Sequence, residues 1–527
     1  MRRRGIDEPS ARVVTWYNKR NFLGTGNAMP VEEATYLEQM ALAQVSILTK
    51  SDETTIGVLR ASGYRKEILQ YVLFTEVGSW ATDSSGAFTS TAPRNNNWCF
   101  GSIPWRTALE YDATAWLHLA PATSGAGAAA GAGSVPVSDL SRFQVVGSGS
   151  RGIVDVWSSG GTYLGCFHYI GMSGSSGSGT LTVPTTGYGS IGFVPTSLAG
   201  VGATNPQTGA AWVLPTLASI PAGAVLRGRV RTGAVSGSTN APQTSNHHWL
   251  GDPTSAAFRN WLKAAYLAYV ASSPGGSGPT DEWDGIFLDN LHTNAEKFTG
   301  NTSSTYGNTP GFVLPTPIGG STWTNAQWDA AHVALIAWMH ANLPGVVLWG
   351  NTYPNEFGTT APEGPERDAQ IAQCVAYAGA GLAGGMLEAF PTKFTSGAIS
   401  YMSRAEFDNG LAYADALIAA DLNLILVSQG AATQGWLNTD AGRFAAAACL
   451  LVQDEDGHAH VRFTNYASGT YPQWWPVTEY HLRLGKPVGA RVRSGTDPVV
   501  YTRDFERGRA SISYPASGTP VATIVGP

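Results

Sequence analysis

Cysteine is scarce in this chain, with four residues among 527. No two of them have the spacing of a metal-ligand pair or of a redox CxxC site, which excludes a disulfide framework and a zinc-binding module. A single bridge stays open as an alternative. Cys374 and Cys449 lie in alanine-rich helical patterns, where we expect buried thiols; the other two are Cys99 and Cys166.

Charged residues are also few, at 13%, and the formal net charge is -6. Because no basic face is evident, we expect no nucleic-acid partner. No apolar run is long enough to cross a bilayer, so we expect no membrane insertion. The arginines at 2–4 are not followed by an apolar segment, and no signal peptide is predicted. The loops, however, are rich in Gly, Ser and Thr, which is typical of extracellular proteins.

Phosphate-binding and esterase motifs are missing as well. No GxGxxG follows the first expected strand, no Walker sequence occurs, and Ser428 lacks a GxSxG elbow. The chain instead alternates short apolar runs with amphipathic helical segments. Eight alternations favour an α/β fold, a (β/α)8 TIM barrel, over an open doubly wound sheet. The expected strands are 13–17, 45–48, 68–74, 346–351, 422–428, 459–463 and two runs that end at Asp289 and Glu388; the expected helices are 31–42, 53–62, 254–272, 324–342, 366–379, 403–419 and 438–452.

One long segment, 121–246, interrupts the alternation after the third strand. It opens with a Gly/Ala/Ser stretch at 124–134, whose composition predicts a flexible linker. Short β-rich pieces follow, which indicate a small sandwich-like inserted domain. We therefore predict a discontinuous barrel at 11–120 and 247–470, an inserted β-rich domain at 121–246, and a C-terminal β-rich segment at 471–527 packed on the barrel. The β pieces of the insert are 143–146, 152–157, 162–167, 180–183 and 224–231.

Two of the apolar runs stop at a carboxylate, Asp289 and Glu388. In a (β/α)8 barrel the carboxyl ends of the strands carry the chemistry. Cleavage of a glycosidic bond needs one acid to protonate the leaving oxygen and one carboxylate to attack carbon or activate water. Asp289 and Glu388 are therefore the candidate catalytic pair. The alternative is that each caps a helix or lies in a solvated loop.

Amides, aromatic rings and further acids follow the other expected strand ends. Such side chains suit a neutral polyhydroxylated ligand, because amides and carboxylates bond hydroxyl groups and rings stack on C–H faces. They suit phosphate poorly. The candidate substrate-binding residues are Trp16, Tyr17, Glu76, Trp80, Asn290, His292, Asn351, Tyr353, Gln429 and Asn465.

Other acidic and histidine residues have structural interpretations. Asp284 lies deeper in its strand, where a bond to barrel backbone is expected, and Glu76 is as compatible with a structural role as with a catalytic one. Adjacent histidines at 247–248 fit an ordinary loop. His458 and His460 alternate along the last strand and are expected to be a buried, satisfied pair. We predict no catalytic metal and no cofactor.

Several runs together resemble a known group. They are the Asp284–Asn290 run, the Met386–Phe390 run, and the closing segments His481–Gly489 and Tyr501–Gly508. They resemble glycoside-hydrolase barrels distantly related to the α-galactosidase superfamily, over about 11–120 and 247–515. The resemblance implies Asp289 as nucleophile and Glu388 as acid/base. The α-galactosidases proper usually carry aspartate at the second position, so the roles and the retention of configuration stay open.

The leading hypothesis is a glycoside hydrolase acting on a cell-surface or capsular polysaccharide. The alternative is a non-catalytic carbohydrate-binding or virion tail structural protein on a barrel scaffold; a polysaccharide lyase or deacetylase is a weaker third hypothesis. By analogy, the missing signal peptide and the glycine-rich insert fit a bacteriophage tail protein. The expected location is thus the virion or the extracellular space, and the expected partners are an envelope glycan and other virion tail proteins.

Overall fold

The computed structural model describes 12–17, 43–48, 56, 60–61, 63–74, 76–78, 112–144, 146, 152–175, 177–187, 189–193, 216–232, 248–271, 283–289, 291, 302–303, 307–308, 324–352, 365–395, 398–429, 440–464 and 482–526. The chain divides into two compact units, which are described separately. The first comprises 1–72, 269–293 and 336–527, and the second comprises 73–268 and 294–335.

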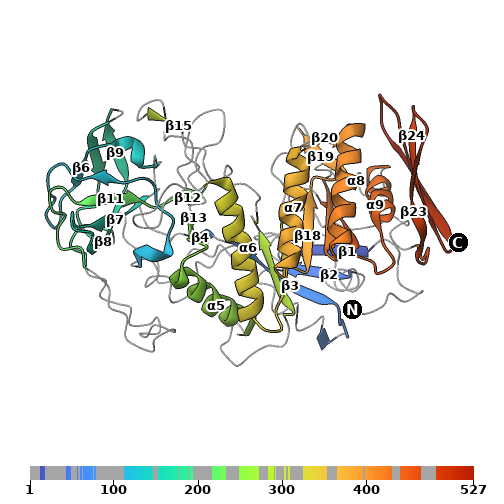
Figure 1. The fold of residues 1–527 in the computed structure, drawn as a ribbon, viewed down its shortest axis with the longest axis horizontal. Helices are drawn as coiled ribbons and strands as arrows, with labels where there is room; N and C mark the ends of the chain where they lie inside the picture. Colours follow the sequence, from blue (N-terminus) through green and yellow to red (C-terminus); the bar gives the residue numbers. More distant parts are fainter. Residues whose placement is uncertain are drawn as a thin grey trace, which may run out of the picture. The chain divides into compact units, whose positions relative to one another are not determined.

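A closed barrel of eight strands is the centre of the first unit (Figure 1). The strands follow one another in chain order, and β1 closes the barrel by pairing in parallel with β22, Arg12 with His460 and Val13 with Val461. The predicted (β/α)8 fold is confirmed. The barrel strands are β1 (Arg12–Tyr17), β2 (Val45–Leu48), β3 (Glu67–Leu73), β14 (Gly285–Asp289), β17 (Val347–Gly350), β18 (Gly384–Glu388), β21 (Asn423–Gln429) and β22 (Ala459–Thr464).

Helices alternate with these strands, and the described ones lie within two residues of their predicted bounds. They are α5 (Ala256–Ala271), α6 (Asn325–Asn342), α7 (Pro365–Gly379), α8 (Arg404–Ala419) and α9 (Asp440–Val452). The predicted helix at 31–42 and most of the one at 53–62 lie outside the described residues. A capping box starts α8: Ser403 Oγ accepts from the Glu406 N–H, and the Glu406 carboxylate accepts from the Ser403 N–H.

Apolar side chains at alternate strand positions fill the barrel interior. Leu69, Phe287, Met386, Ile425 and Trp349 belong to one buried cluster. The Trp349 ring lies against Gly384, where an added Cβ would meet the ring at 2.3 Å. A glycine on β18 thus makes room for the largest side chain of the cluster, which leaves the carboxyl ends of the strands to polar residues.

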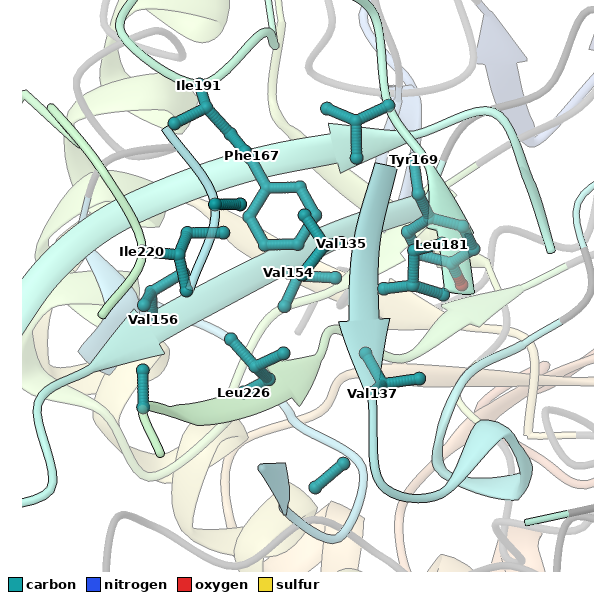
Figure 2. Close-up of a cluster of buried hydrophobic side chains, with 14 of the residues drawn as sticks. Val135, Val137, Val154, Val156, Phe167, Tyr169, Leu181, Ile191, Ile220 and Leu226 are labelled. Carbon is teal, nitrogen blue, oxygen red and sulfur yellow. The ribbon is translucent and has the colours of Figure 1, made fainter. Parts of the chain in front are cut away.

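The chain between β3 and β14 contains the inserted β-rich domain, within the second unit. One sheet has the order β5 (Ala122–Thr123), β11 (Val225–Gly228), β7 (Gly152–Trp157), β8 (Tyr163–Tyr169), and the other β6 (Ser134–Val137), β10 (Gly179–Thr182), β9 (Gly171–Gly174). Figure 2 shows side chains from both sheets, among them Val154, Phe167, Leu226, Val135 and Leu181, converging on one buried core. The sandwich-like insert is confirmed.

Two details of the predicted insert are wrong. The stretch 124–134 is no flexible linker, because Ala128 pairs with Ile220 through both backbone hydrogen bonds and Ser124 is buried. The second error is the strand at 143–146. Asp139 instead caps a 3-10 turn, η4 (Leu140–Arg142), and Phe143 donates its N–H to the Leu140 carbonyl.

Smaller sheets complete the second unit. A three-stranded sheet joins β12 (Arg231–Thr232), β13 (His248–Leu250) and β4 (Glu76–Gly78). A 3-10 turn, η3 (Ala113–Ala115), precedes the sandwich, and β15 (Thr302–Ser303) pairs with β16 (Gly307–Asn308). The short strand β4 thus belongs to a sheet outside the barrel, although it follows β3 closely in sequence.

A four-stranded antiparallel sheet ends the first unit and packs against α9 (Figure 1). Its strands are β23 (Pro487–Ser494), β24 (Val499–Phe505), β25 (Gly508–Tyr514) and β26 (Val521–Val525). Aromatic rings carry the contact: Phe407 of α8 meets Tyr501 and Tyr514, with centroids 5.3 and 5.1 Å away. The Tyr501 hydroxyl also donates to Asp408 Oδ1 at 2.7 Å. The predicted C-terminal β-rich segment is confirmed.

Cys166, Cys374 and Cys449 are buried, as expected for Cys374 and Cys449, and Cys99 lies outside the described residues. Among the residues that the structure describes, no helix combines the length and the apolar character needed to cross a membrane.

Candidate active site

Two carboxylates lie at the carboxyl ends of two barrel strands. Asp289 is the last residue of β14 and Glu388 is the last residue of β18, and β17 lies between these two strands. Both strands are buried up to their final residue, which is half-buried. The strands run in the same direction, so their end residues meet at one rim of the barrel.

One amide joins the two acids. Asn351 directly follows β17, and its Nδ2 donates to Asp289 Oδ1 at 3.0 Å and to Glu388 Oε2 at 3.2 Å. Two atoms that lie 3.0 and 3.2 Å from the same nitrogen are no more than about 6.2 Å apart, so the two carboxylate oxygens are close to each other. The side chains therefore point toward the same small volume.

A tyrosine from β3 completes the surroundings of Asp289. The Tyr71 hydroxyl donates to Asp289 Oδ2. Its ring is buried and stacks on Phe287, with centroids 6.1 Å apart and the planes 15° from parallel. Each oxygen of Asp289 thus accepts a hydrogen bond from a different barrel strand or strand end. These bonds hold the carboxylate in one orientation.

The chain leaves β18 through a constrained turn. Ala389, which follows Glu388, has a φ of 60°, a left-handed conformation that is unfavourable for a residue with a Cβ. The next residue, Phe390, donates its N–H to the Val427 carbonyl at 3.0 Å and stacks on Phe407 with centroids 5.5 Å apart. A hairpin of β19 (Thr392–Thr395) and β20 (Ala398–Tyr401) follows. These contacts fix the position of the backbone at Glu388.

Of the predicted lining residues, Asn351 lies between the acids, and Gln429 ends β21 at the same end of the barrel strands, half-buried. Trp16 and Tyr17 are the last two residues of β1, in register with Ile47 and Leu48. Glu76 follows β3 closely in sequence, begins β4 in the second unit and pairs with Leu250, and its role in substrate binding stays a prediction. The remaining ones fall outside the described residues and stay predictions: Trp80, Asn290, His292, Tyr353 and Asn465.

Sequence reasoning missed Tyr71. Tyr71 lies within β3 and not after it, and its ring is long enough for the hydroxyl to reach Asp289. The position of Tyr71 in its strand is the feature that could have identified it. It stands two residues beyond Leu69, which belongs to the same interior cluster, so the period of two in a strand puts both on the inner face.

Asp284 has the structural role that was expected. Its Oδ2 accepts from the Ile68 backbone N–H at 2.8 Å and from Arg60 Nη2 at 2.5 Å. These bonds tie β3 to the start of β14. The Asp284 carboxylate that accepts these bonds lies at the opposite end of β14 from Asp289.

The two histidines of the last strand region are engaged in separate contacts. His460 lies on β22 with its ring edge toward Trp349, at a centroid distance of 5.7 Å. His458 precedes β22, and its Nδ1 lies 2.5 Å from Asp454 Oδ2, a hydrogen bond that raises the pKa of His458 against the opposing effect of burial. Within the described ranges, no three His, Cys, Asp or Glu side chains are grouped as metal ligands.

The fold and the acid pair define a class: an eight-stranded (β/α)8 protein with two carboxylates at the strand ends. Residues 238–509, just over half of the chain, match the family described as "Hypothetical glycosyl hydrolase family 15". The chain belongs to this family. The α-galactosidase resemblance is not tested by this match and stays a prediction.

Two solved structures are similar in a limited way. One is the glycoside hydrolase domain of PelA from Pseudomonas aeruginosa, with 10% identity over 89% of this chain and 98% of that chain and a TM-score of 0.35. The other is a variant of that domain, with the same identity and coverage and a TM-score of 0.33. These values are too low to transfer any property of that domain. No curated protein sequence matches the chain.

Proposed function

We propose that this protein is a retaining glycoside hydrolase that cleaves a cell-surface or capsular polysaccharide, with Asp289 as nucleophile and Glu388 as acid/base. The observation that carries the proposal is the single Asn351 amide that donates to both carboxylates. Membership of a glycosyl hydrolase family supports the reaction class. The half-buried strand-end acids supply the two groups that the reaction needs.

The spacing of the acids favours retention over inversion. Retaining enzymes hold their two carboxyl groups about 5–5.5 Å apart, and inverting enzymes leave room for a water at about 6.5–9.5 Å. The Asn351 contacts limit the separation of the two bonded oxygens to about 6.2 Å at most, which lies below the range for inverting enzymes. A direct attack by Asp289 on the anomeric carbon therefore fits better than activation of water.

The reaction then proceeds in two steps. An Asp289 oxygen bonds to the anomeric carbon while the bond to the leaving oxygen breaks, and Glu388 gives its proton to that oxygen. The resulting glycosyl ester is hydrolysed when Glu388 takes a proton from water and the hydroxide oxygen bonds to the anomeric carbon. Asp289 is released as the carboxylate. Tyr71 and Asn351 orient the attacking group throughout.

The test is release of reducing ends from purified capsular and envelope polysaccharides, with a panel of nitrophenyl glycosides as simpler probes. We expect Asp289→Asn and Glu388→Gln each to lower kcat/KM by at least about 10²–10⁴-fold, the range typical of lost acid–base or nucleophilic groups. Asp368→Asn, an exposed acid on α7, is the matched control and should equal the wild type. Equal activity in all four proteins would refute the assignment.

Stereochemistry supplies a second, independent readout. Proton NMR of the first product should show the anomeric configuration of the substrate. Azide added to Glu388→Ala should restore turnover and give a glycosyl azide of retained configuration, because azide needs no general base to attack the glycosyl ester. A product of inverted configuration from the wild type would make Asp289 a base for water.

The non-catalytic alternative predicts a different result: binding of the same polysaccharides with no release of reducing ends by the wild type. The virion or extracellular location and the association with other tail proteins stay predictions from the sequence. Their test is detection of this chain by mass spectrometry in purified virions.

A further inference from the structure

We propose that Thr352 and Gly385 form a clamp that positions the Asn351 amide between the two acids, a role that rests on the proposed function. The ladder between β17 and β18 is short, with one register pair, Trp349 with Gly384. Beyond it, the two strands have no regular pairing to fix Asn351 relative to Glu388. From this point on, the hydrogen bonds of a side chain connect the two strands.

The Thr352 hydroxyl replaces the missing backbone bonds. Its Oγ1 accepts from the Met386 N–H at 3.2 Å and donates to the Met386 carbonyl at 3.3 Å. Thr352 follows Asn351 directly, and Met386 stands two residues before Glu388. The hydroxyl therefore links the two short segments whose relative position sets the 3.2 Å contact between Asn351 Nδ2 and Glu388 Oε2.

Gly385 makes the approach of the hydroxyl possible. A Cβ added at Gly385 would lie 2.7 Å from Thr352 Oγ1 and 3.4 Å from its Cγ2. The first distance is shorter than a van der Waals contact, so any larger residue here must displace the hydroxyl. The glycine is thus a requirement of the clamp on the β18 side.

The outer side of the clamp is held by two helices. Cys374 Sγ of α7 and the Tyr413 hydroxyl of α8 each lie 3.5 Å from the Thr352 carbonyl, and they lie 2.7 Å from each other. All three residues have no exposed surface. These contacts fix the backbone of Thr352, and its complete burial restricts the side chain that places the hydroxyl on Met386.

The experiment compares three single variants. Thr352→Val keeps the shape and removes the hydroxyl, Thr352→Ser keeps the hydroxyl, and Gly385→Ala displaces it from the other strand. Ser124→Ala is the matched control, because Ser124 Oγ also accepts from a backbone N–H and donates to a carbonyl, at 2.9 and 2.7 Å, but in the inserted domain. Kinetics use the polysaccharide or nitrophenyl glycoside on which the wild type is most active.

We expect Thr352→Val and Gly385→Ala to lower kcat by about 10–10²-fold with KM changed less than about threefold, the effect of a misplaced catalytic contact. Thr352→Ser should stay within about threefold of the wild type, and Ser124→Ala should lose only stability. The kcat of the double variant of Thr352→Val and Gly385→Ala should be no lower than that of the less active single variant, because both changes break the same contact. Unchanged kcat in Thr352→Val overturns the proposal.

A crystal structure of Thr352→Val separates this proposal from the proposed function. We expect the Asn351 amide to move beyond hydrogen-bond distance, about 3.5 Å, from at least one acid. An amide that still contacts both acids overturns the clamp whether or not the protein is active. A wild type without glycosidase activity refutes the proposed function instead, and the clamp is then decided on this contact alone.

Discussion

The inserted domain contains a fully buried ion-pair network whose disruption can be predicted in magnitude. Asp155 of β7 has no exposed side-chain surface, and it accepts from Arg229 at 2.6 and 2.7 Å, from His118 Nε2 at 2.7 Å and from the Tyr163 hydroxyl at 2.8 Å. Burial alone raises the pKa of Asp155, but the charge and hydrogen bonds of Arg229 and the bond from His118 hold it well below its usual range.

Asp155→Asn keeps the size of the side chain and removes its charge. The Arg229 guanidinium, which is also without exposed surface, then loses the charge of Asp155 while it stays buried. Breaking such a pair from one side costs about 3–5 kcal/mol. Because about 1.4 kcal/mol corresponds to a factor of ten, 3 kcal/mol predicts amide exchange at least about 150-fold faster.

The assay is hydrogen exchange by mass spectrometry on the full chain, read on peptides that cover β7 and β8. Local exchange is the appropriate measure because a chain of two units is not expected to unfold in one step. The control is Asp139→Asn. It breaks an ion pair with Arg142 in which both side chains are about one-third exposed, and asparagine still caps the η4 turn. That loss should stay below about 1 kcal/mol.

The pH dependence gives a second check. A depressed carboxyl pKa contributes stability that is complete above the unfolded value near 3.9 and is lost as the pH falls through the folded value. The penalty of Asp155→Asn should therefore be the same at about pH 5 and pH 7. Equal exchange in Asp155→Asn and Asp139→Asn would refute the reasoning, since it would mean that the guanidinium finds water or another anion.

The remaining predictions concern the barrel and the sheet beside it. The raised pKa of His458 means that its bond to Asp454 stabilises the fold fully below about pH 6.5 and is lost as the pH rises through the folded pKa. His458→Gln should thus lower Tm more at about pH 6 than at pH 8, and equal losses in the two melts would contradict this sign. Phe407→Ala should lower the free energy of unfolding by about 3–5 kcal/mol and speed amide exchange in β24 and β25. Val375→Ala, on exposed helix surface, should change neither quantity. An unchanged exchange rate in Phe407→Ala would show that the sheet packs on the barrel without this ring.

The barrel strands were predictable from sequence for a physical reason. A strand that is covered on both faces needs apolar residues at every position, and such a run is visible without any knowledge of the partner strands. Val45–Leu48 is fully buried and has the predicted bounds, and the runs that end at Asp289 and Glu388 end there in the structure as well. The signal for each strand is contained in its own residues.

Features that depend on distant parts of the chain were not predictable in this way. Ala128 lies in a Gly/Ala stretch with the composition of a linker, yet Ile220 pairs with its backbone. A Cβ at Gly127 would meet the Ile220 carbonyl at 2.7 Å, so small residues serve close packing there rather than flexibility. The pairing of Glu76 with Leu250 is a second example, because its nearness to β3 in sequence does not predict it. Composition alone does not distinguish these cases.

The acid pair itself argues against a purely structural role for these residues. Two like charges at such a short spacing would repel one another, so the fold gains nothing from a second acid beside Asp289. Asn351 and Tyr71 can donate to Asp289 whether or not residue 388 is an acid. If the pair serves catalysis, Glu388→Gln should therefore abolish activity while leaving Tm equal or higher, as is common where active sites trade stability for function. If the pair serves only the fold, the same variant should lower Tm, because an acceptor for the buried Asn351 amide is replaced by a group that also carries donors.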